Sequence, residues 1–252
     1  MFRYIAAAAV CSAGLFFTAG CNGSAKFTCD NLTAGNAARL SPRENAPTIT
    51  VTPFTDMRPY ERSGSALLGM IPLRPYGYAE AGQPENNETF YSIGHYNFDA
   101  VNDLTAAAAE SLRASNLFSR VEQRSAVGSD TDYIFSATIV DCSYKARWFT
   151  YCVTYIGAAP FWVIGCPTGS SSIHLRLRFE IMERKTGQVV WAQEFDESDY
   201  LNHWLYCRYQ ADMDLLPALM RRAMNLAVID IESTGAVSEN PPHVEQPPPG
   251  NW

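Results

Sequence analysis

Residues 172–181 read Ser-Ile-His-Leu-Arg-Leu-Arg-Phe-Glu-Ile, and this run decides the class of fold. Apolar and polar side chains alternate along it, which is typical of a strand with one buried and one wet face. We expect Leu175, Leu177, Phe179 and Ile181 to face helices, and His174, Arg176 and Arg178 to face water. A short turn at 185–187 leads into a second strand-like run at 188–195, so the two runs predict a β-hairpin.

Strand-like and helix-like patterns alternate before and after this hairpin. Further strand candidates are 48–54, 118–122 and 133–144. Apolar side chains recur every three or four positions in 98–115 and again in 213–232, which predicts two amphipathic helices. Residues 55–97 are rich in Gly, Pro and Tyr, and we expect mostly loop there.

This order predicts one domain of the α+β class, over residues 48–233. We expect a mixed, largely antiparallel sheet with two main helices on one face. The order of elements is β-α-β-β-(apolar insert)-β-β-α, with the insert at about 146–170. Residues 21–47 lack apolar periodicity and predict a flexible tether, whereas 234–252 are rich in Pro and predict a disordered tail.

The first twenty residues have the pattern of an export signal. Arg3 is the only charged residue before an apolar run at 4–17, and small residues follow as far as position 20. A run of this length is too short for a permanent membrane span, which needs about 20 apolar residues. We therefore assign 1–20 as a signal peptide.

Residues 18–21 read Thr-Ala-Gly-Cys, and they resemble the bacterial lipobox. The resemblance implies that Cys21 carries fatty acids such as palmitate and becomes the first residue of the mature lipoprotein. Asn22 follows it in place of Asp, which implies an outer-membrane anchor with the domain facing the periplasm. Two or more acyl chains on one residue make a stable membrane anchor.

Five cysteines remain when the signal is removed and Cys21 is acylated. They are Cys29, Cys142, Cys152, Cys166 and Cys207. An odd number leaves at least one unpaired thiol or an intermolecular bridge, and an oxidising periplasm permits up to two disulfides. No CxxC motif or zinc-type spacing appears, so we expect no metal site.

Composition and motifs argue against several classes of function. The chain has 252 residues, 47% of them hydrophobic and 18% charged, with a net charge of −7. The acidic balance argues against a nucleic-acid binder, because phosphate contacts need clustered positive charge. The sequence contains no GxSxG elbow and no phosphate-binding loop. We therefore expect no catalytic residues and no cofactor, and a protein that is not an enzyme.

Two groups of charged residues have both a functional and a structural interpretation. The acidic run Glu194, Asp196, Glu197 and Asp199 would suit a cation or an acid–base pair, or else a solvated strand face. The solvated face is favoured, because no glycine-bounded calcium loop surrounds the run. Asp56 lies two residues before Arg58, and we expect an ion pair or a turn cap there.

Several short strings, in this order, resemble exported domains of the TolB amino-terminal, CsgG and LpoB group. The strings are residues 51–56, 117–121, 132–137 and 186–191, together with the closing helix. The resemblance implies a part in envelope interaction or secretion. It suggests a non-enzymatic accessory component of envelope assembly or transport, or alternatively a subunit of an oligomeric CsgG-like channel. Its partners would be the membrane, through the anchor, and an envelope protein or further copies of itself.

The apolar insert is the most distinctive part of the sequence. Residues 148–175 contain no Asp, Glu, Lys or Arg. Three interpretations of the insert are open: it packs on its own domain, it forms a contact patch, or it supplies two membrane-crossing strands in a ring of subunits. The residues of the hypothetical contact patch are Trp148, Phe149, Tyr151, Tyr155, Phe161 and Trp162. A second apolar run at 66–73 would extend the same patch.

Overall fold

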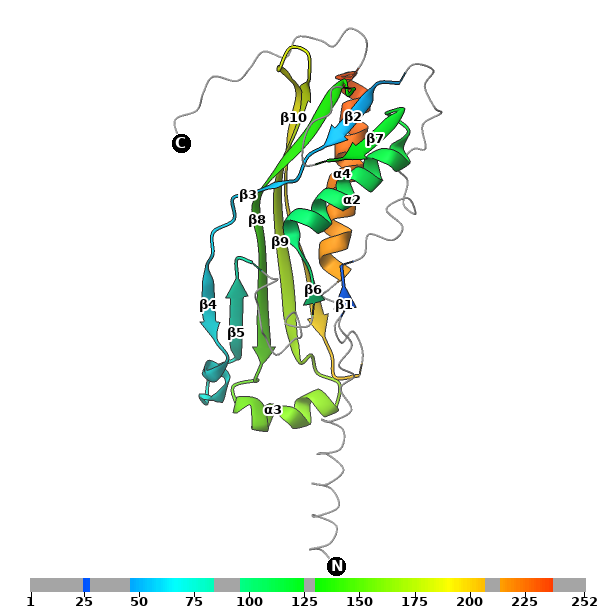
Figure 1. Cartoon of the computed structure of the whole chain (residues 1–252). Coiled ribbons are helices and arrows are strands. Elements are labelled where there is room, and N and C mark those ends of the chain that lie inside the picture. Colours follow the sequence, from blue (N-terminus) through cyan, green and yellow to red (C-terminus); the bar gives the residue numbers. More distant parts are fainter. Residues whose placement is uncertain (1–24, 28–45, 84–95, 125–129, 207–213, 238–252) are drawn as a thin grey trace, which may run out of the picture.

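Two long antiparallel strands, β8 (Tyr133–Phe149) and β9 (Gly169–Glu183), run the length of the domain (Figure 1). The computed structural model describes residues 25–27, 46–83, 96–124, 130–206 and 214–237. Strand β10 (Val189–His203) pairs antiparallel with β9, with Phe195 opposite Leu177. The hairpin predicted from the alternating decamer is therefore confirmed.

Shorter strands pair in succession along the other edge of β8. In chain order, they are β2 (Thr48–Val51), β3 (Thr55–Asp56) and β5 (Tyr76–Ala81). The first two run parallel to β8, and β5 runs antiparallel to it. Strand β7 (Arg120–Gln123) pairs parallel with β2, and β4 (Arg62–Ser65) pairs antiparallel with β5. These pairings complete a mixed sheet of eight strands in which the longest pairs are antiparallel.

The expectation of mostly loop over 55–97 was wrong for residues 55–81, which contain three strands and a 3₁₀ helix. Between β4 and β5 lies a 3₁₀ helix, η2 (Ala66–Met70), so this stretch forms a hairpin that extends the sheet beside the second half of β8. The pairing of Tyr78 with Arg147 of β8 fixes the hairpin in place. Local patterning does not reveal a contact between segments that lie so far apart in the chain.

Two helices cover one face of the sheet, which confirms the predicted α+β class. Helix α2 (Ala100–Ser115) contacts β2, β3 and β7, whereas α4 (Leu215–Thr234) contacts β9, β10 and α2. Asp99 caps α2 by accepting a hydrogen bond of 3.0 Å from the backbone N–H of Asn102. Gly235 ends α4 with a φ of 62°, a left-handed conformation that glycine adopts without steric cost.

The core lies between this sheet face and the two helices. Leu175, Leu177, Phe179 and Ile181 are all fully buried, as the alternation predicts. Phe179 packs near Phe135 of β8 and Phe54, with ring centroids 5.6 and 6.5 Å away. The side chains of Arg176 and Arg178 lie on the wet face, where each is about two-fifths exposed.

A β-bulge in β8 changes which residues face the core. The register with β9 shifts between Ile139 and Asp141. Odd-numbered residues such as Phe135 are buried before the shift, and even-numbered residues such as Cys142 and Trp148 are buried after it. The strand therefore continues to Phe149, five residues beyond the predicted end at position 144.

The predicted tether and tail are in part structured. Strand β1 (Ala25–Lys26) pairs parallel with β6 (Tyr96–Asn97), and Phe27 is buried against Phe98 at 5.3 Å between ring centroids. A flexible tether over 21–47 was therefore wrong for 25–27, because a buried aromatic side chain fixes the chain there. At the other end, Ala236 and Val237 are buried. Residues 1–20, for which the sequence predicts a signal peptide, lie outside the described residues, as do Cys21 and 238–252.

Candidate functional site

The predicted insert folds into a turn and a helix at one end of the sheet. Strand β8 ends at Phe149, and α3 (Thr154–Val163) then lies across the ends of the long strands (Figure 1). The intervening turn redirects the chain from β8 into α3, and Tyr151 and Cys152 have positive φ angles there. A helix takes the place of the two crossing strands that the ring hypothesis requires.

Aromatic side chains hold α3 against the domain. The indole N–H of Trp162 donates to the backbone carbonyl of Phe149 at 3.1 Å. The hydroxyl of Tyr151 donates to the carbonyl of Pro167 at 2.6 Å, and its ring stacks on Phe161 with centroids 5.2 Å apart. These contacts use both the apolar rings and their polar atoms, so the aromatic residues position the helix.

The hairpin helix η2 packs beside α3, as the sequence predicted for the second apolar run. A Cβ atom at Gly69 would lie only 2.1 Å from Cζ of Tyr155, so the ring sits directly on the η2 backbone. The backbone N–H of Leu73 donates to the carbonyl of Cys152 at 3.0 Å. The two segments therefore form one unit.

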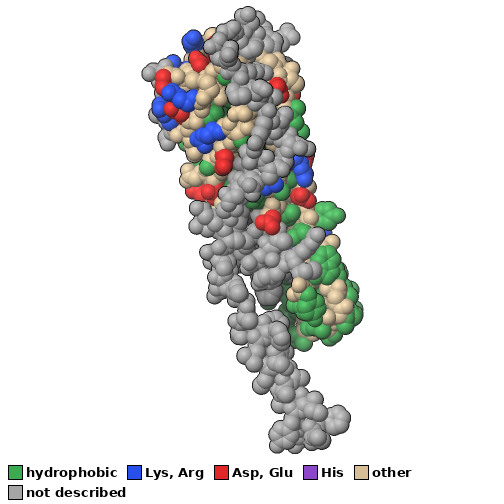
Figure 2. Space-filling model, turned by 90° about the vertical axis from the view of Figure 1, so that its right-hand side faces the viewer, with side chains coloured by type: hydrophobic (Ala, Val, Ile, Leu, Met, Phe, Trp, Pro, Cys, Tyr) green, Lys and Arg blue, Asp and Glu red, His purple; other side chains and the backbone are tan. Residues whose placement is uncertain are grey.

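The outer surface of this unit is aliphatic, and we call it the apolar tip. Ile156, Ile164 and Leu73 are 78%, 77% and 84% exposed. Figure 2 shows hydrophobic side chains covering this end of the described domain. The apolar tip consists of Leu67, Met70, Ile71, Leu73, Val153, Ile156, Phe161, Val163 and Ile164.

Most of the predicted contact residues lie behind this surface. Trp148 is only 4% exposed at an inward position of β8, so it does not belong to an exposed patch. Phe149, Tyr151, Tyr155 and Trp162 are partly buried, and Phe161 alone of the six is an exposed large hydrophobic residue. The exposed surface is formed mainly by the aliphatic residues of the two uncharged runs. Most of the aromatic residues instead fill the contact between α3 and the sheet.

Backbone strain is concentrated at the same end. Of the five non-glycine residues with positive φ in the described part of the chain, four lie here: Leu73, Tyr151, Cys152 and Thr154. A β-branched or bulky residue in this conformation carries steric strain, which is found most often at functional sites. The strain and the exposed apolar surface point to the same region.

The acidic run of β10 pairs with basic side chains on both faces of the sheet. Glu194 and Asp196 lie on the wet face, whereas Glu197 and Asp199 lie on the face that α4 covers. Arg176 donates to Glu194 at 2.5 Å, and Arg222 of α4 donates to Glu197 at 2.6 Å. The guanidinium of Arg222 also lies 3.6 Å from Asp199. The interpretation as a solvated strand face therefore holds for Glu194 and Asp196, which pair with Arg176 of the neighbouring strand. Glu197 and Asp199 instead link β10 to α4.

His174 lies between two carboxylates on this wet face. Its Nδ1 is 2.8 Å from Asp141 and its Nε2 is 2.6 Å from Asp196, which also contacts Arg176 at 3.5 Å. Burial lowers the pKa of His174, but the hydrogen bonds and charges of Asp196 and Asp141 outweigh it and raise the pKa above its ordinary value of 6.5. The protonated imidazole is therefore favoured in the folded state.

We expect stability to fall as the pH rises through the titration of His174. A group whose pKa is raised by folding stabilises the fold below its unfolded pKa and loses that contribution above its folded pKa. Urea unfolding at about pH 6 and at about pH 8 measures this slope. The His174→Gln variant should show a flatter slope, and an unchanged slope would contradict the assignment.

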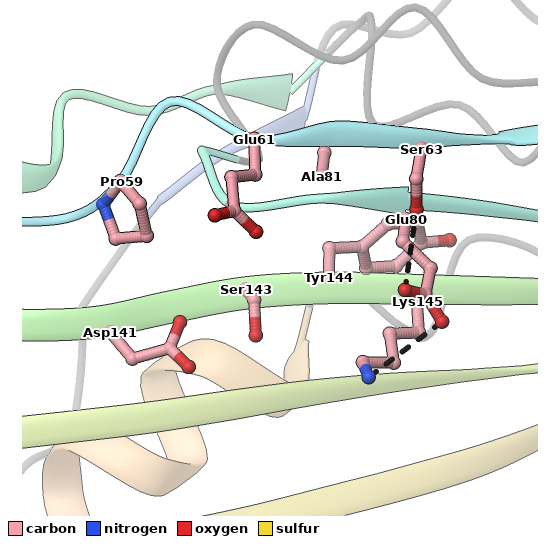
Figure 3. Close-up of a pocket in the computed structure, with 10 residues that line it drawn as sticks. Pro59, Glu61, Ser63, Glu80, Ala81, Asp141, Ser143, Tyr144 and Lys145 are labelled. Carbon is pink, nitrogen blue, oxygen red and sulfur yellow. Dashed lines mark hydrogen bonds and ion pairs between the residues drawn. The ribbon is translucent and has the colours of Figure 1, made fainter.

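A shallow cavity of about 230 Å³ opens between the β4–β5 hairpin and β8 (Figure 3). Its charged lining residues are Glu61, Glu80, Asp141 and Lys145. Glu80 lies 3.6 Å from Nζ of Lys145 and accepts a weak hydrogen bond of 3.4 Å from Ser63. Among the described residues, no group of three His, Cys, Asp or Glu side chains is placed to hold a metal ion.

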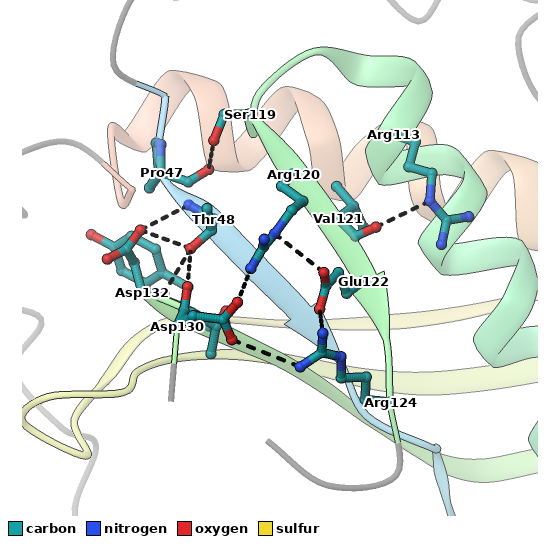
Figure 4. A network of polar contacts seen from close by, with 12 residues as sticks. Pro47, Thr48, Arg113, Ser119, Arg120, Val121, Glu122, Arg124, Asp130 and Asp132 are labelled. Atoms are coloured by element: carbon teal, nitrogen blue, oxygen red, sulfur yellow. Dashed lines mark hydrogen bonds and ion pairs between the residues drawn. The ribbon is translucent and has the colours of Figure 1, made fainter. Parts of the chain in front are cut away.

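Charged residues form a further network at the end of the sheet opposite the apolar tip (Figure 4). Arg120 pairs with Asp130 and Glu122, and Arg124 pairs with Glu122 at 2.6 Å. Asp132 accepts a hydrogen bond of 2.9 Å from the backbone N–H of Thr48, which is the main cause of its lowered pKa. These contacts fix β2 and β7 to β8, and we assign them a structural role.

The remaining polar candidates are also explained by structure. Ser171 and His203 form a hydrogen bond of 2.7 Å, but each residue is only 2% exposed, so no substrate reaches the pair. Asp56 and Arg58 form the expected ion pair, at 2.8 Å. No disulfide joins Cys142, Cys152 and Cys166, whereas Cys29 and Cys207 lie outside the described residues.

Comparisons with known proteins leave the chain without a family. No protein-family model and no curated protein matches it. Within the described ranges, none of the helices combines the length and apolar character needed to cross a membrane.

Solved structures show only distant likenesses. A DUF330-family protein from Xanthomonas campestris is 12% identical with a TM-score of 0.36, over 79% of this chain and 91% of that one. The PelC dodecamer from Paraburkholderia phytofirmans is 14% identical with a TM-score of 0.31, over 72% and 91%. A hypothetical protein from Chlamydia trachomatis is 11% identical with a TM-score of 0.40, over 77% and 99%. These values are too low to assign a family or a function.

Proposed function

We propose that this protein is a lipoprotein anchored to the outer membrane through Cys21, whose periplasmic domain acts by contact and not by catalysis. The apolar tip is the observation that carries the proposal. Side chains such as Ile156 and Leu73 are more than three-quarters exposed, and a soluble domain rarely leaves a continuous apolar surface open to water. Such a surface is typical of a site that binds a membrane or a protein.

The sequence supplies the other part of the argument. The apolar run at 4–17 and the Thr-Ala-Gly-Cys string at 18–21 support export and acylation. The resemblance of four further strings to the TolB amino-terminal, CsgG and LpoB group supports a role in envelope assembly or transport. The charged clusters of the domain are engaged in structural ion pairs. This supports a protein that acts by binding and not by catalysis.

The anchor is tested by replacing Cys21. We expect the Cys21→Ser variant to lose fatty-acid labelling completely, because only the thiol of this residue accepts the acyl group in the proposed processing. Metabolic labelling with a palmitate analogue, followed by gel electrophoresis, measures this. Cys152→Ser is the matched control, since it removes an exposed thiol elsewhere and should label normally. Normal labelling of Cys21→Ser would contradict the proposal.

The size of the native assembly distinguishes the accessory component from the channel subunit. An accessory lipoprotein should appear as a small species after extraction from the membrane. A large ring would favour the channel subunit instead. Native mass spectrometry of the extracted lipoprotein makes the comparison.

A further inference from the structure

We propose that the apolar tip docks on the surface of a phospholipid bilayer that carries anionic headgroups, with α3 lying along the membrane plane. This deepens the proposed function, whose anchor would hold the domain beside a membrane. The occupant of the apolar tip is then lipid, and the long strands extend away from the bilayer. The charges, the arrangement of exposed residues and the position of the chain before β1 each support this docking.

The exposed residues of α3 form one stripe. Ile156, Pro160, Phe161 and Val163 of α3 are exposed, and so are Val153 and Ile164, which flank the helix. Residues three or four positions apart, such as Ile156, Pro160 and Val163, lie on a single face of a helix. Helix α3 lies across the end of the sheet (Figure 1), and the exposure of these side chains shows that they are turned away from the domain. A flat apolar medium fits such a stripe.

The formal charges next to the apolar tip are positive. Segments 66–79 and 146–173 contain two charged residues of the Asp, Glu, Lys and Arg types, Arg74 and Arg147, in a chain with a net charge of −7. Both arginines are exposed, and the guanidinium of Arg147 lies 5.3 Å from the centre of the Tyr76 ring. Guanidinium groups bind phosphate well, and tyrosine favours the headgroup region. This arrangement suits an anionic membrane surface.

The aliphatic character of the apolar tip favours lipid over a protein partner. Protein contact sites depend on Trp, Tyr and Arg anchors, and Leu and Val are under-represented among them. Here the aromatic rings of Tyr151 and Trp162 are turned to the domain, while Ile156, Ile164 and Leu73 are turned outward. Aliphatic side chains can be buried among the hydrocarbon chains of lipids without a pocket of matching shape.

The chain before β1 places the proposed anchor near the same end. Cys21 precedes Ala25 by four residues, so it lies within about 14 Å of β1 even when the chain is fully extended. Strand β1 lies in the same half of the molecule as α3 (Figure 1). An acylated Cys21 would therefore bring the apolar tip close to the bilayer, which makes insertion effectively intramolecular.

Hydroxyl-radical footprinting of the mature lipoprotein in vesicles tests the docking. The vesicles contain phosphatidylethanolamine and phosphatidylglycerol. Ile156 is 78% exposed and Ile229 of α4 is 53% exposed, so exposure alone predicts stronger labelling of Ile156. Docking predicts the reverse, with Ile156 labelled several-fold less than Ile229. Labelling of Ile156 at least as strong as that of Ile229 would overturn the proposal.

Variants and lipid composition sharpen the test. Ile156→Asp should restore labelling of Leu73 and Ile164, whereas the matched control Ile229→Asp should leave them protected. The double variant Arg74→Gln and Arg147→Gln, or vesicles of phosphatidylcholine alone, should weaken the protection. If Ile156 is protected as strongly under these conditions as in the unchanged protein with phosphatidylglycerol, anionic headgroups have no role in the docking. If Ile156 is labelled in vesicles but protected in native envelopes, the apolar tip binds a protein and not lipid.

The same samples separate this inference from the proposed anchor. Mass spectrometry of the amino-terminal peptide reports whether Cys21 is acylated. An unmodified Cys21 with a protected apolar tip, measured with vesicles in excess, contradicts the anchor and supports the docking. An acylated Cys21 with a fully labelled apolar tip contradicts the docking and supports the anchor.

Discussion

Replacing Phe179 by Ala lowers the free energy of unfolding by about 3–5 kcal/mol, the usual cost of removing a fully buried aromatic ring. Phe179 is 0% exposed and contacts the rings of both Phe54 and Phe135. The three rings come from the loop after β2, from β8 and from β9, so the cavity would lie where separate segments of the sheet meet. Urea unfolding followed by circular dichroism measures the loss.

The matched control is the neighbouring position on the other face of β9. The side chain of Arg178 is 43% exposed and lies 3.7 Å from Glu194. Exposed ion pairs contribute little, so Arg178→Ala should cost less than about 1 kcal/mol. A neutral Phe179→Ala combined with a large loss for Arg178→Ala would mean that the register of β9 is inverted.

The second large effect is expected at Thr105, which links α2 to the chain after β2. Its hydroxyl accepts a hydrogen bond of 3.0 Å from the backbone N–H of Phe54 and donates to the carbonyl of Val101 at 2.5 Å. Thr105 is 1% exposed. Thr105→Val keeps the shape but leaves the buried N–H of Phe54 without an acceptor, which should cost about 1–3 kcal/mol.

Thr105→Ser provides the control for this prediction. It retains the hydroxyl and removes only a methyl group, so the acceptor for Phe54 is preserved. Thermal and urea unfolding should rank the wild type first, then Thr105→Ser and then Thr105→Val. A Thr105→Val variant as stable as the wild type would show that the hydroxyl is not needed for α2 to pack on β2.

Local periodicity was sufficient for the regular elements of the fold. The alternation at 172–181 predicted which face of β9 is buried, because each residue of a strand turns its side chain to the opposite face. Helices α2 and α4 begin and end within two residues of their predicted bounds, because their apolar stripes and caps are encoded in consecutive residues.

The extent of β8 was harder to predict, although its signal was present. Residues 141–148 read Asp-Cys-Ser-Tyr-Lys-Ala-Arg-Trp, which alternates polar and apolar side chains. The bulge between Ile139 and Asp141 reverses the alternation, so the two halves of the strand do not form one continuous pattern. The expected end at position 144 and the assignment of Trp148 to an insert both follow from this interruption.

The sequence by itself determined the α+β class, the hairpin, the two main helices and the uncharged character of the insert, since these depend on neighbouring residues. The sequence suggested that the run at 66–73 extends the patch of the insert, but only the tertiary structure supplied the contact between them, in which Tyr155 of α3 lies against Gly69 of η2. The tertiary structure also decided which residues of the tip are exposed. The aromatic rings found partners for both their apolar faces and their polar atoms within the domain, whereas the aliphatic side chains of Ile156, Ile164 and Leu73 were left facing outward.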